Sequence, residues 1–454
     1  MRRRRLLSFC LGFLLLAGAL LPVVRAADRP VELAGAVELP EAPEIQAEYA
    51  ILMEMKSGTI LYEKNARSRA YPASTTKVLT ALLTMENCQL EDSVTFSFRA
   101  THEIPEDSST IARTEGEIMT VEECLYGMMV SSANEVAQAL GEHISGSLES
   151  FAALMTLRAY ELGAVNSHFA NAHGYYDPEH YTCAYDLALI MREAMQYDVL
   201  RSIMGTERWE IPPTNKHSET TYLRMKHPLL SNAEEMKYPY AVAGKTGYTP
   251  EAGNTLVTYA KQGGLDLICV VMRDPSSKAT GEDSVALFNY GFQNFQCLSL
   301  SSAESIQQNQ DDDFLDDDLL RLTGSSDSWC TLPLGMTLSD LRSEVILMGG
   351  TEKDSALAAR IYYLGDREVG RIRLSAVPIE ERIKLEPVVR VEPSKKEILR
   401  RVYLGLPLIY WILIGGGLLV LVILLLIVLF IRRLLRQRKR RQEQARRALN
   451  RIAE

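Results

Sequence analysis

The stretch YPASTTKVLTALLTMEN, residues 71–87, combines a helical pattern with two reactive side chains. Its apolar residues from Val78 to Met85 recur at helical spacing, which predicts a helix from about Ser74 to Asn87. A proline just before a helix favours its start, and backbone N–H groups near Ser74 are then left unpaired. One helical turn separates Ser74 from Lys77, so the lysine amine can reach the serine hydroxyl.

A serine hydroxyl is a weak nucleophile until a base removes its proton. A lysine can be that base only when burial or a second cation lowers its pKa. The sequence therefore predicts a nucleophile at Ser74, a base at Lys77 and another cation nearby. The Ser-x-x-Lys spacing occurs once in the chain, although a single occurrence is weak evidence by itself.

Two further motifs offer candidates for the rest of a site. Ser132-Ala133-Asn134 lies between two predicted helices, where a second hydroxyl could relay a proton and an amide could hold a peptide group. Lys245-Thr246-Gly247 lies on a predicted strand, where Lys245 would supply the second cation and Thr246 would bind a carboxylate. Gly247 would let a substrate backbone approach closely. The three motifs in this order are a strong signal together.

The surrounding segments predict an α/β (α+β) domain over residues 48–297, with an antiparallel sheet and helices. Short apolar runs that end at turn residues predict strands, at 50–55, 59–62, 241–249, 254–259 and 265–272. Gly263-Gly264 predicts an antiparallel turn between the last two. Apolar residues at helical spacing predict helices at 120–129, 134–144, 184–195 and 282–295. Thr120 and Glu123 have the spacing of a capping box.

The first 26 residues have the features of a secretory signal peptide. Arg2–Arg5 form a positive start, an apolar run follows at 6–21, and Val24-Arg25-Ala26 places small residues where a signal peptidase reads them. Cleavage is expected after Ala26, with an uncleaved signal anchor as the alternative.

Residues 404–431 carry no charge and predict one transmembrane helix, with a long buried helix as the alternative. A helix of this length spans about 42 Å, more than the roughly 30 Å of a hydrocarbon core. The tail at 432–454 is basic, and basic residues beside a span stay cytoplasmic. These features predict a single-pass protein of a bacterial cell membrane, with the intervening domains outside and the tail against anionic lipid.

The composition, 47% hydrophobic and 24% charged over 454 residues, excludes wholesale disorder, collagen and disulfide-knot classes. The part between signal and span is strongly acidic, because the signal and the tail together hold 15 of the 49 Lys and Arg residues but only two of the 58 acids. An acidic domain has no basic face for a nucleic acid, so no nucleic-acid partner is expected.

Three further segments lie before or after the predicted catalytic domain. Residues 27–47 are rich in Pro, Glu and Ala and predict a flexible arm. Residues 298–330 include two runs of aspartates and predict an acidic linker, with calcium binding as the lesser alternative. Residues 331–393 predict a small β-rich module, because alternating residues surround a turn at Gly365-Asp366.

The cysteines and histidines have no spacing typical of a metal site. No CxxC pair and no HExxH occurs, so neither a zinc site nor a dithiol redox site is indicated. Cys124 and Cys269 lie in apolar runs and are predicted to be buried thiols. No metal and no cofactor is expected.

Together the three motifs resemble the signature of penicillin-binding proteins and serine β-lactamases. Four sequence segments narrow the resemblance to the serine-type D-Ala-D-Ala carboxypeptidases, which are low-molecular-mass penicillin-binding proteins. These segments are Lys64-Asn65, residues 71–77, Phe169–Gly174 and residues 244–249. The resemblance covers residues 45–297 well and reaches weakly to the hairpin near Gly365. It implies the penicillin-binding-protein and β-lactamase-like fold.

The resemblance implies a penicillin-sensitive peptidase that removes the terminal D-Ala from peptidoglycan stem pentapeptides. By position, Ser74 would attack the carbonyl between the two D-alanines, Lys77 would accept its proton, and Ser132 would relay a proton to the leaving D-Ala. β-Lactams mimic this substrate and would acylate Ser74.

The resemblance also assigns the groups that would bind the substrate. Asn134 would orient the acyl chain, and Lys245 and Thr246 would hold the terminal carboxylate. The backbone N–H groups of Ser74 and Tyr248 would form the oxyanion hole. Tyr248 stands where histidine is common in this family, so we expect an altered rate or β-lactam preference. His173 lies in a family-like stretch and is expected to fix a loop.

Several alternatives stay open at the level of sequence. A serine β-lactamase would acylate in the same way, but Glu161 and Asn166 lack the spacing of its deacylation pair. A penicillin or muropeptide sensor would acylate once and signal inward, yet the tail is short. A transpeptidase differs only in that an amine takes the acyl group in place of water.

Overall fold

The computed structural model describes residues 39–232, 236–300, 320–324, 328–348 and 356–378. The predicted signal peptide, transmembrane helix and basic tail lie outside these residues, as do most of the arm and of the acidic linker. Within the described ranges, none of the helices is both long and apolar enough to cross a bilayer.

A five-stranded antiparallel sheet forms the centre of the catalytic domain, in the order β2-β1-β9-β8-β7. Its strands are β1 (Tyr49–Glu54), β2 (Ile60–Lys64), β7 (Ala241–Thr249), β8 (Gly253–Gln262) and β9 (Leu265–Asp274). The predicted hairpin and the three predicted strands are confirmed. Gly263 and Gly264 both have positive φ angles, as the turn between β8 and β9 requires.

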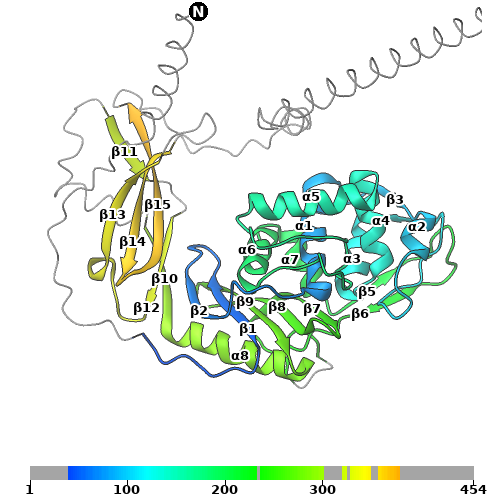
Figure 1. Ribbon diagram of the computed structural model, residues 1–454, viewed down its shortest axis with the longest axis horizontal. Coiled ribbons are helices and arrows are strands. Elements are labelled where there is room, and N and C mark those ends of the chain that lie inside the picture. The colour runs from blue at the N-terminus through cyan, green and yellow to red at the C-terminus, as the bar shows by residue number, and fades with distance from the viewer. Residues whose placement is uncertain (1–38, 233–235, 301–319, 325–327, 349–355, 379–454) are drawn as a thin grey trace, which may run out of the picture. The chain divides into compact units, whose positions relative to one another are not determined.

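The sheet is covered on both faces, so its central strands read as continuous apolar runs. On β9, Leu267, Cys269 and Val271 join the core under α8 (Ser277–Asn294). Their neighbours Ile268 and Val270 point the other way, into the core of the helical layer. In Figure 1, α8 lies along one side of the sheet and the remaining helices lie on the other.

The helical layer holds four of the five predicted helices and three that were not predicted. Its members are α1 (Lys77–Asn87), α2 (Phe98–His102), α3 (Val121–Val130), α4 (Asn134–Ser145), α5 (Leu148–Glu161), α6 (Ala184–Ala194) and α7 (Asp198–Gly205). The capping box at Thr120 and Glu123 is present and begins α3. Two short hairpins complete the domain, β3 (Ser93–Thr95) with β4 (Ile118–Thr120) and β5 (Arg208–Ile211) with β6 (Thr221–Arg224).

Two helix starts differ from the prediction. The helix expected from Ser74 begins as a 3-10 turn over Ala73–Thr76, and α1 proper starts at Lys77. The left-handed φ of +48° at Ala73 prevents a regular α-helical start there. Helix α8 starts at Ser277, earlier than the predicted 282, because the Ser276 side chain accepts the Ala279 N–H and caps it.

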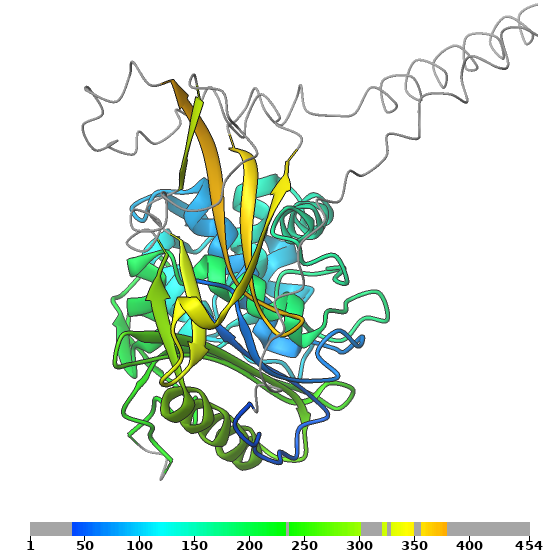
Figure 2. The ribbon, with the colours of Figure 1, turned by 90° about the vertical axis from the view of Figure 1, so that its left-hand side faces the viewer.

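The β-rich module is a second, six-stranded antiparallel sheet with its own core. It contains β10 (Phe295–Ser299), β11 (Leu320–Gly324), β12 (Trp329–Pro333), β13 (Arg342–Leu347), β14 (Ala356–Leu364) and β15 (Arg367–Pro378). The predicted hairpin at Gly365-Asp366 joins β14 to β15. Figure 2 shows these strands in yellow to orange.

This sheet takes in residues that the sequence analysis placed outside the module. Strand β10 begins within the predicted catalytic domain, and β11 and the start of β12 lie within the predicted linker. The reason is burial, since Leu300 and Cys330 are both 0% exposed in the core of this sheet. The end of the predicted arm is likewise fixed, because the N–H groups of Gln46 and Ala47 donate to Asp283.

Cys124 and Cys269 are buried thiols, as predicted. Burial raises the pKa of both, and for Cys269 the value is about 12.

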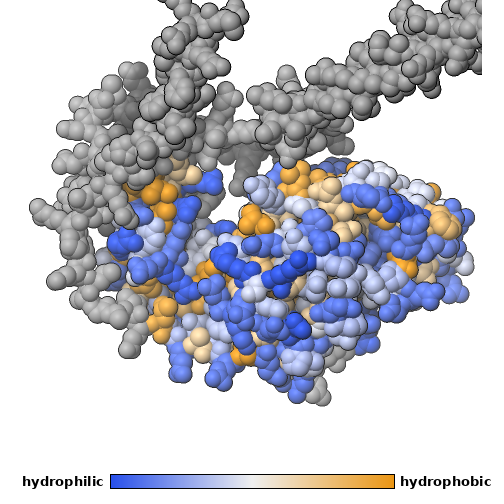
Figure 3. All heavy atoms as spheres, in the orientation of Figure 1, coloured by the Kyte–Doolittle hydropathy of each residue, from blue (hydrophilic) through white to orange (hydrophobic). Residues whose placement is uncertain are grey.

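The exposed surface is different in character. On the face shown in Figure 3, hydrophilic residues predominate and hydrophobic residues form small scattered patches.

Candidate active site

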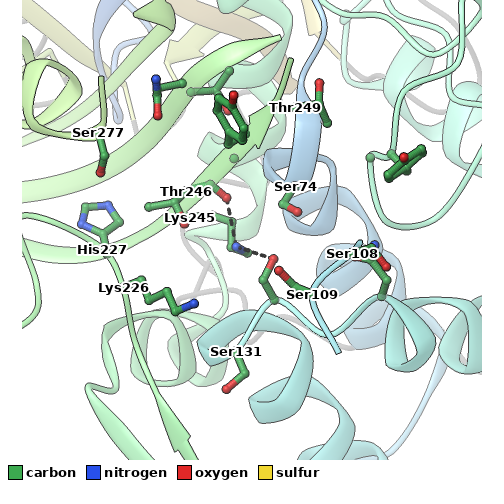
Figure 4. A pocket seen from close by; sticks show the side chains of 18 of the residues that line it. Ser74, Ser108, Ser109, Ser131, Lys226, His227, Lys245, Thr246, Thr249 and Ser277 are labelled. Atoms are coloured by element: carbon green, nitrogen blue, oxygen red, sulfur yellow. Dashed lines mark hydrogen bonds between the residues drawn. The ribbon is translucent and has the colours of Figure 1, made fainter. Parts of the chain in front are cut away.

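The three motifs meet at one cleft of about 580 Å³ between the edge strand β7 and the helical layer. Seven of the eight predicted site residues line it, namely Ser74, Ser132, Asn134, Lys245, Thr246, Gly247 and Tyr248. The eighth, Lys77, lies beneath Ser74 and is 0% exposed. Figure 4 shows the side chains of Ser74, Lys245 and Thr246 around the same space.

Ser74 is held in the 3-10 turn that precedes α1. The carbonyl of Pro72 accepts both the backbone N–H and the hydroxyl of Thr75, and the hydroxyl bond is 2.6 Å long. Gly174 packs directly against this turn, because a Cβ there would lie 1.8 Å from the Ala73 carbonyl oxygen. Ser74, the predicted nucleophile, is therefore positioned by backbone strain at Ala73 and by a neighbouring loop.

Lys77 is the first residue of α1, and its amine makes three short contacts. Nζ lies 2.9 Å from Ser74 Oγ, 2.7 Å from Asn134 Oδ1 and 2.8 Å from the His173 carbonyl oxygen. The last two oxygens can only accept hydrogen bonds. A neutral amine would donate both of its N–H groups to them and turn its lone pair toward the Ser74 hydroxyl.

Burial, followed by the charge of Lys245, holds the pKa of Lys77 well below its ordinary value. Glu135 acts in the opposite direction but is the weakest of the three causes. A lowered pKa favours the neutral amine, which is the form that can accept a proton from serine. The position of Lys77 and its lowered pKa are both what the predicted base requires.

Ser132 and Lys245 meet in the cleft from its two sides, Ser132 from the break between α3 and α4 and Lys245 from β7. Lys245 Nζ donates to Ser132 Oγ over 3.1 Å and to the Thr246 carbonyl over 3.0 Å. Ser132 has a φ of +63°, which is unusual for a residue other than glycine and aims its side chain from the break between α3 and α4. The helix boundary predicted from sequence is thus a strained turn.

Lys245 is nearly fully buried, and its pKa is lowered to about 7 by burial and by the charge of Lys226. Its charge is consequently lost near neutral pH. An anion bound in the cleft would favour the charged form and raise this pKa again.

The pH profile of kcat/KM is expected to fall on the alkaline side, from about pH 7, for substrates that end in a carboxylate. The sign follows from Lys245, because the charged form exists below its pKa and is lost as the pH rises through it. Initial rates measured from pH 5 to 10 test this. A peptide that ends in an amide should lack this fall, and a profile that rises steadily through pH 9 would contradict the prediction.

Strand β7 lies against the nucleophile turn because Gly247 has no side chain. A Cβ at Gly247 would lie 2.4 Å from Thr255 Oγ1 and 2.9 Å from both the Ser74 nitrogen and the Pro72 oxygen. The close approach brings the strand carrying Tyr248 beside the backbone N–H of Ser74. That arrangement fits the predicted oxyanion hole.

Gly247→Ala is expected to lower kcat/KM roughly 100-fold, because the added methyl group moves β7 away from Ser74. The measurement is steady-state kinetics together with a thermal melt. Gly263→Ala is the matched control, since nothing lies within 4 Å of its Cβ and its positive φ costs stability alone. Equal kcat/KM for Gly247→Ala and the parent chain would show that the close approach is not needed.

Two buried histidines fix the loop that packs on the site. His173 Nδ1 accepts the Tyr175 N–H, while its carbonyl binds Lys77. His180 accepts the N–H groups of Ala170 and Asn171, so its other nitrogen carries the proton toward Thr76 Oγ1. Burial lowers the pKa of His180 to about 3 and that of His173 well below its ordinary value. The loop-fixing interpretation of His173 agrees with these contacts.

Sequence reasoning missed six charged or aromatic residues that also line the cleft, namely Asp107, Tyr175, Tyr176, Lys226, His227 and Glu251. The charge of Lys226 lowers the pKa of Lys245. Asp107 accepts a hydrogen bond from the Tyr175 hydroxyl over 3.2 Å. Glu251 follows β7. No local pattern marks these residues, because they come from loops that only the fold brings together. Tyr248, which stands where histidine is common in the family that the sequence resembles, is 64% exposed at the cleft.

The sheet, the helical layer and the Ser-Lys cleft define the penicillin-binding-protein and β-lactamase-like class of fold. A family model described as D-alanyl-D-alanine carboxypeptidase matches residues 36–276. The chain belongs to the D-alanyl-D-alanine carboxypeptidase family.

Several known proteins are similar to this chain. D-alanyl-D-alanine carboxypeptidase DacF of Bacillus subtilis is 34% identical over 258 residues, which is 55% of this chain and 63% of DacF. DacC of Escherichia coli is 30% identical over 57% of this chain and 64% of its own length. The chain thus matches a little under two thirds of each of these two relatives.

The similarity extends to solved structures. The Streptomyces K15 DD-transpeptidase has a TM-score of 0.52 and 29% sequence identity to this chain. The match covers 56% of this chain and 99% of that one. Just over half of this chain therefore matches almost the whole of that solved chain.

Proposed function

We propose that this chain is a serine D-Ala-D-Ala carboxypeptidase that removes the terminal D-Ala from peptidoglycan stem pentapeptides. One observation carries the proposal. A fully buried lysine amine with a lowered pKa lies 2.9 Å from a serine hydroxyl at the floor of a cleft that a second cation lines. Family membership supports the choice of substrate.

Acylation begins when Ser74 Oγ attacks the carbonyl carbon between the two D-alanines. The serine proton passes to the neutral amine of Lys77, which becomes an ammonium group. The backbone N–H groups of Ser74 and Tyr248 bind the oxyanion of the tetrahedral intermediate. Lys245 and Thr246 hold the terminal carboxylate, which places the scissile bond at the nucleophile.

Collapse of the intermediate breaks the C–N bond and releases D-Ala. The leaving nitrogen takes a proton from the Ser132 hydroxyl, and the Lys77 ammonium group gives its proton to Ser132, so the Lys77 amine is neutral again. Asn134 holds the acyl chain during this step. Water then attacks the ester, Lys77 accepts its proton, and the trimmed peptide leaves. A β-lactam amide would follow the first half of this path and acylate Ser74.

We also propose that the catalytic domain acts outside the cytoplasm of a bacterium, anchored by residues 404–431. The support is the sequence alone: the signal-like start, the uncharged run and the basic tail.

No contact favours the β-lactamase alternative. Glu161 ends α5 and pairs with Arg158, while the Asn166 N–H donates to Asp186. Neither Glu161 nor Asn166 lines the cleft. The deacylating carboxylate of such an enzyme therefore has no counterpart at these two positions.

The test is D-alanine release by the full-length chain, purified in detergent, from a diacetyl-Lys-D-Ala-D-Ala peptide. We expect release from this peptide and none from the L-Ala-L-Ala isomer. Adding glycine as an acceptor separates hydrolysis from transpeptidation. Absence of release, in protein that mass spectrometry still shows to be acylated by penicillin, would favour a sensor over an enzyme.

A further inference from the structure

A cluster of three potential metal ligands lies at the far end of the helices that carry the catalytic residues. The Cys88 sulfur, a carboxylate oxygen of Asp92 and a ring nitrogen of His143 all lie within 4.8 Å of one another. Cys88 is the C-cap of α1, and His143 is in the last turn of α4. His143 is far from Cys88 and Asp92 in sequence, so the three residues do not form a recognisable metal motif.

We propose that Cys88, Asp92 and His143 bind one zinc-class divalent cation, which clamps the C-terminal ends of α1 and α4 together. Thiolate, imidazole and carboxylate are the three ligand types that proteins use for zinc. The sulfur ligand disfavours calcium and magnesium, which take oxygen ligands. Three protein ligands leave a fourth position for water.

The geometry needs only small side-chain movements. Bonds of about 2.0–2.3 Å in a tetrahedral site place ligand atoms roughly 3.3–3.8 Å apart. The three ligand atoms lie up to 4.8 Å apart, which is wider than a tetrahedral site needs. His143 is exposed, so its ring can rotate toward the other two ligands. The movement involves side chains at a surface and no repacking of the core.

The loop that carries two of the ligands is held in place from several sides. The Cys88 N–H donates to the Thr84 carbonyl, and the carbonyls of Leu90 and Asp92 accept N–H groups from the start of α3. The Gln89 N–H donates to Asp92 Oδ2 over 2.8 Å and orients the carboxylate. Such supporting bonds to a ligand are typical of metal sites.

The local field also favours a cation. The C-terminal ends of α1 and α4 both lie at the cluster, because Cys88 caps α1 and His143 is in the last turn of α4. The C-terminal end of a helix carries partial negative charge. The last turn of α1 contains no basic residue, and that of α4 contains only His143 itself. A bound cation would compensate both helix ends.

The same two helices begin at the active site. Lys77 starts α1 and Asn134 starts α4, and their side chains are 2.7 Å apart. A rise of about 1.5 Å per residue puts the cluster roughly 15 Å away from Lys77. The cation therefore cannot touch the substrate, and its role is to fix the pair of helices that positions base and amide.

The first test is metal binding by the full-length chain in detergent, stripped with a chelator and kept reduced. We expect one equivalent of zinc by competition with a chromophoric chelator. Cobalt in place of zinc should give a thiolate-to-metal charge-transfer band. Cys88→Ser should remove that band, and Cys88→Ser, Asp92→Asn and His143→Gln should each weaken zinc binding at least tenfold. Zinc should also raise the Tm of the parent chain by several degrees.

Matched controls separate the site from general thiol or imidazole binding. Cys297→Ser changes a half-buried thiol on β10, and His102→Gln changes an exposed imidazole on α2, so both should bind zinc as the parent does. The proposal fails if zinc does not saturate at one equivalent, or if the band survives Cys88→Ser. Binding without a rise in Tm would contradict the clamp.

Discussion

Ser74→Ala should reduce D-alanine release about 10⁴-fold or more and abolish covalent labelling by penicillin. The Ser74 hydroxyl lies 2.9 Å from the buried Lys77 amine. The other two contacts of that amine are the amide oxygen of Asn134 and the carbonyl oxygen of His173, which are not nucleophiles. Without it no acyl-enzyme can form, so both readouts fail together. The measurements are steady-state release and intact-protein mass spectrometry after exposure to penicillin.

Ser277→Ala is the matched control for this prediction. Ser277 lines the same cleft at the start of α8 but has no contact with Lys77. We expect its rate to stay within a few-fold of the parent chain. Loss of the Ser74 hydroxyl removes one hydrogen bond, so stability should change by about 1 kcal/mol at most. Residual penicillin labelling of Ser74→Ala would place the nucleophile elsewhere.

The parts of the fold and site that sequence predicted are those with local patterns. Ser74 and Lys77 are one turn apart, and the capping box at Thr120 acts over three residues. Strand β9 is apolar from Leu267 to Met272 because both of its faces are buried there. In each case the physical cause lies within a short window, so the pattern is visible without the fold.

The features that sequence could not predict depend on contacts between distant segments. The His173 carbonyl that binds Lys77 comes from a loop fixed by His180. The positive φ at Ser132 leaves no mark on a serine. Helix α5 was missed because exposed Leu157 and Tyr160 interrupt its polar face, which blurs the hydrophobic stripe.

The cluster of Cys88, Asp92 and His143 likewise depends on contacts between distant segments. Spacing rules detect metal sites whose ligands lie close together in sequence, and they indicated none here. Cys88 and His143 meet only because α1 and α4 start at one cleft and end side by side. No metal is expected from the sequence, and the proposed zinc site departs from that expectation for this reason.

Lys77→Arg should lower kcat roughly 10³- to 10⁴-fold, because a guanidinium stays protonated and cannot accept the serine proton. The same substitution at Lys245 is the matched control. Position 245 needs a positive charge for the carboxylate, so Lys245→Arg should change KM more than kcat. Steady-state kinetics on both variants test this contrast, and a Lys77→Arg variant within tenfold of the parent would mean that another group is the base.

A stability measurement on Lys77→Met separates the role of the base from damage to the fold. Burial lowers the pKa of Lys77 in the folded chain well below its ordinary value of 10.5. Between these two pKa values the unfolded chain binds the extra proton, so the free energy of unfolding rises with pH. Lys77→Met removes that contribution, and its Tm should depend less on pH from 7 to 10 than the parent's does. If the two pH dependences are equal, the lysine is not neutral in the folded chain, and the argument for Lys77 as the base loses its electrostatic support.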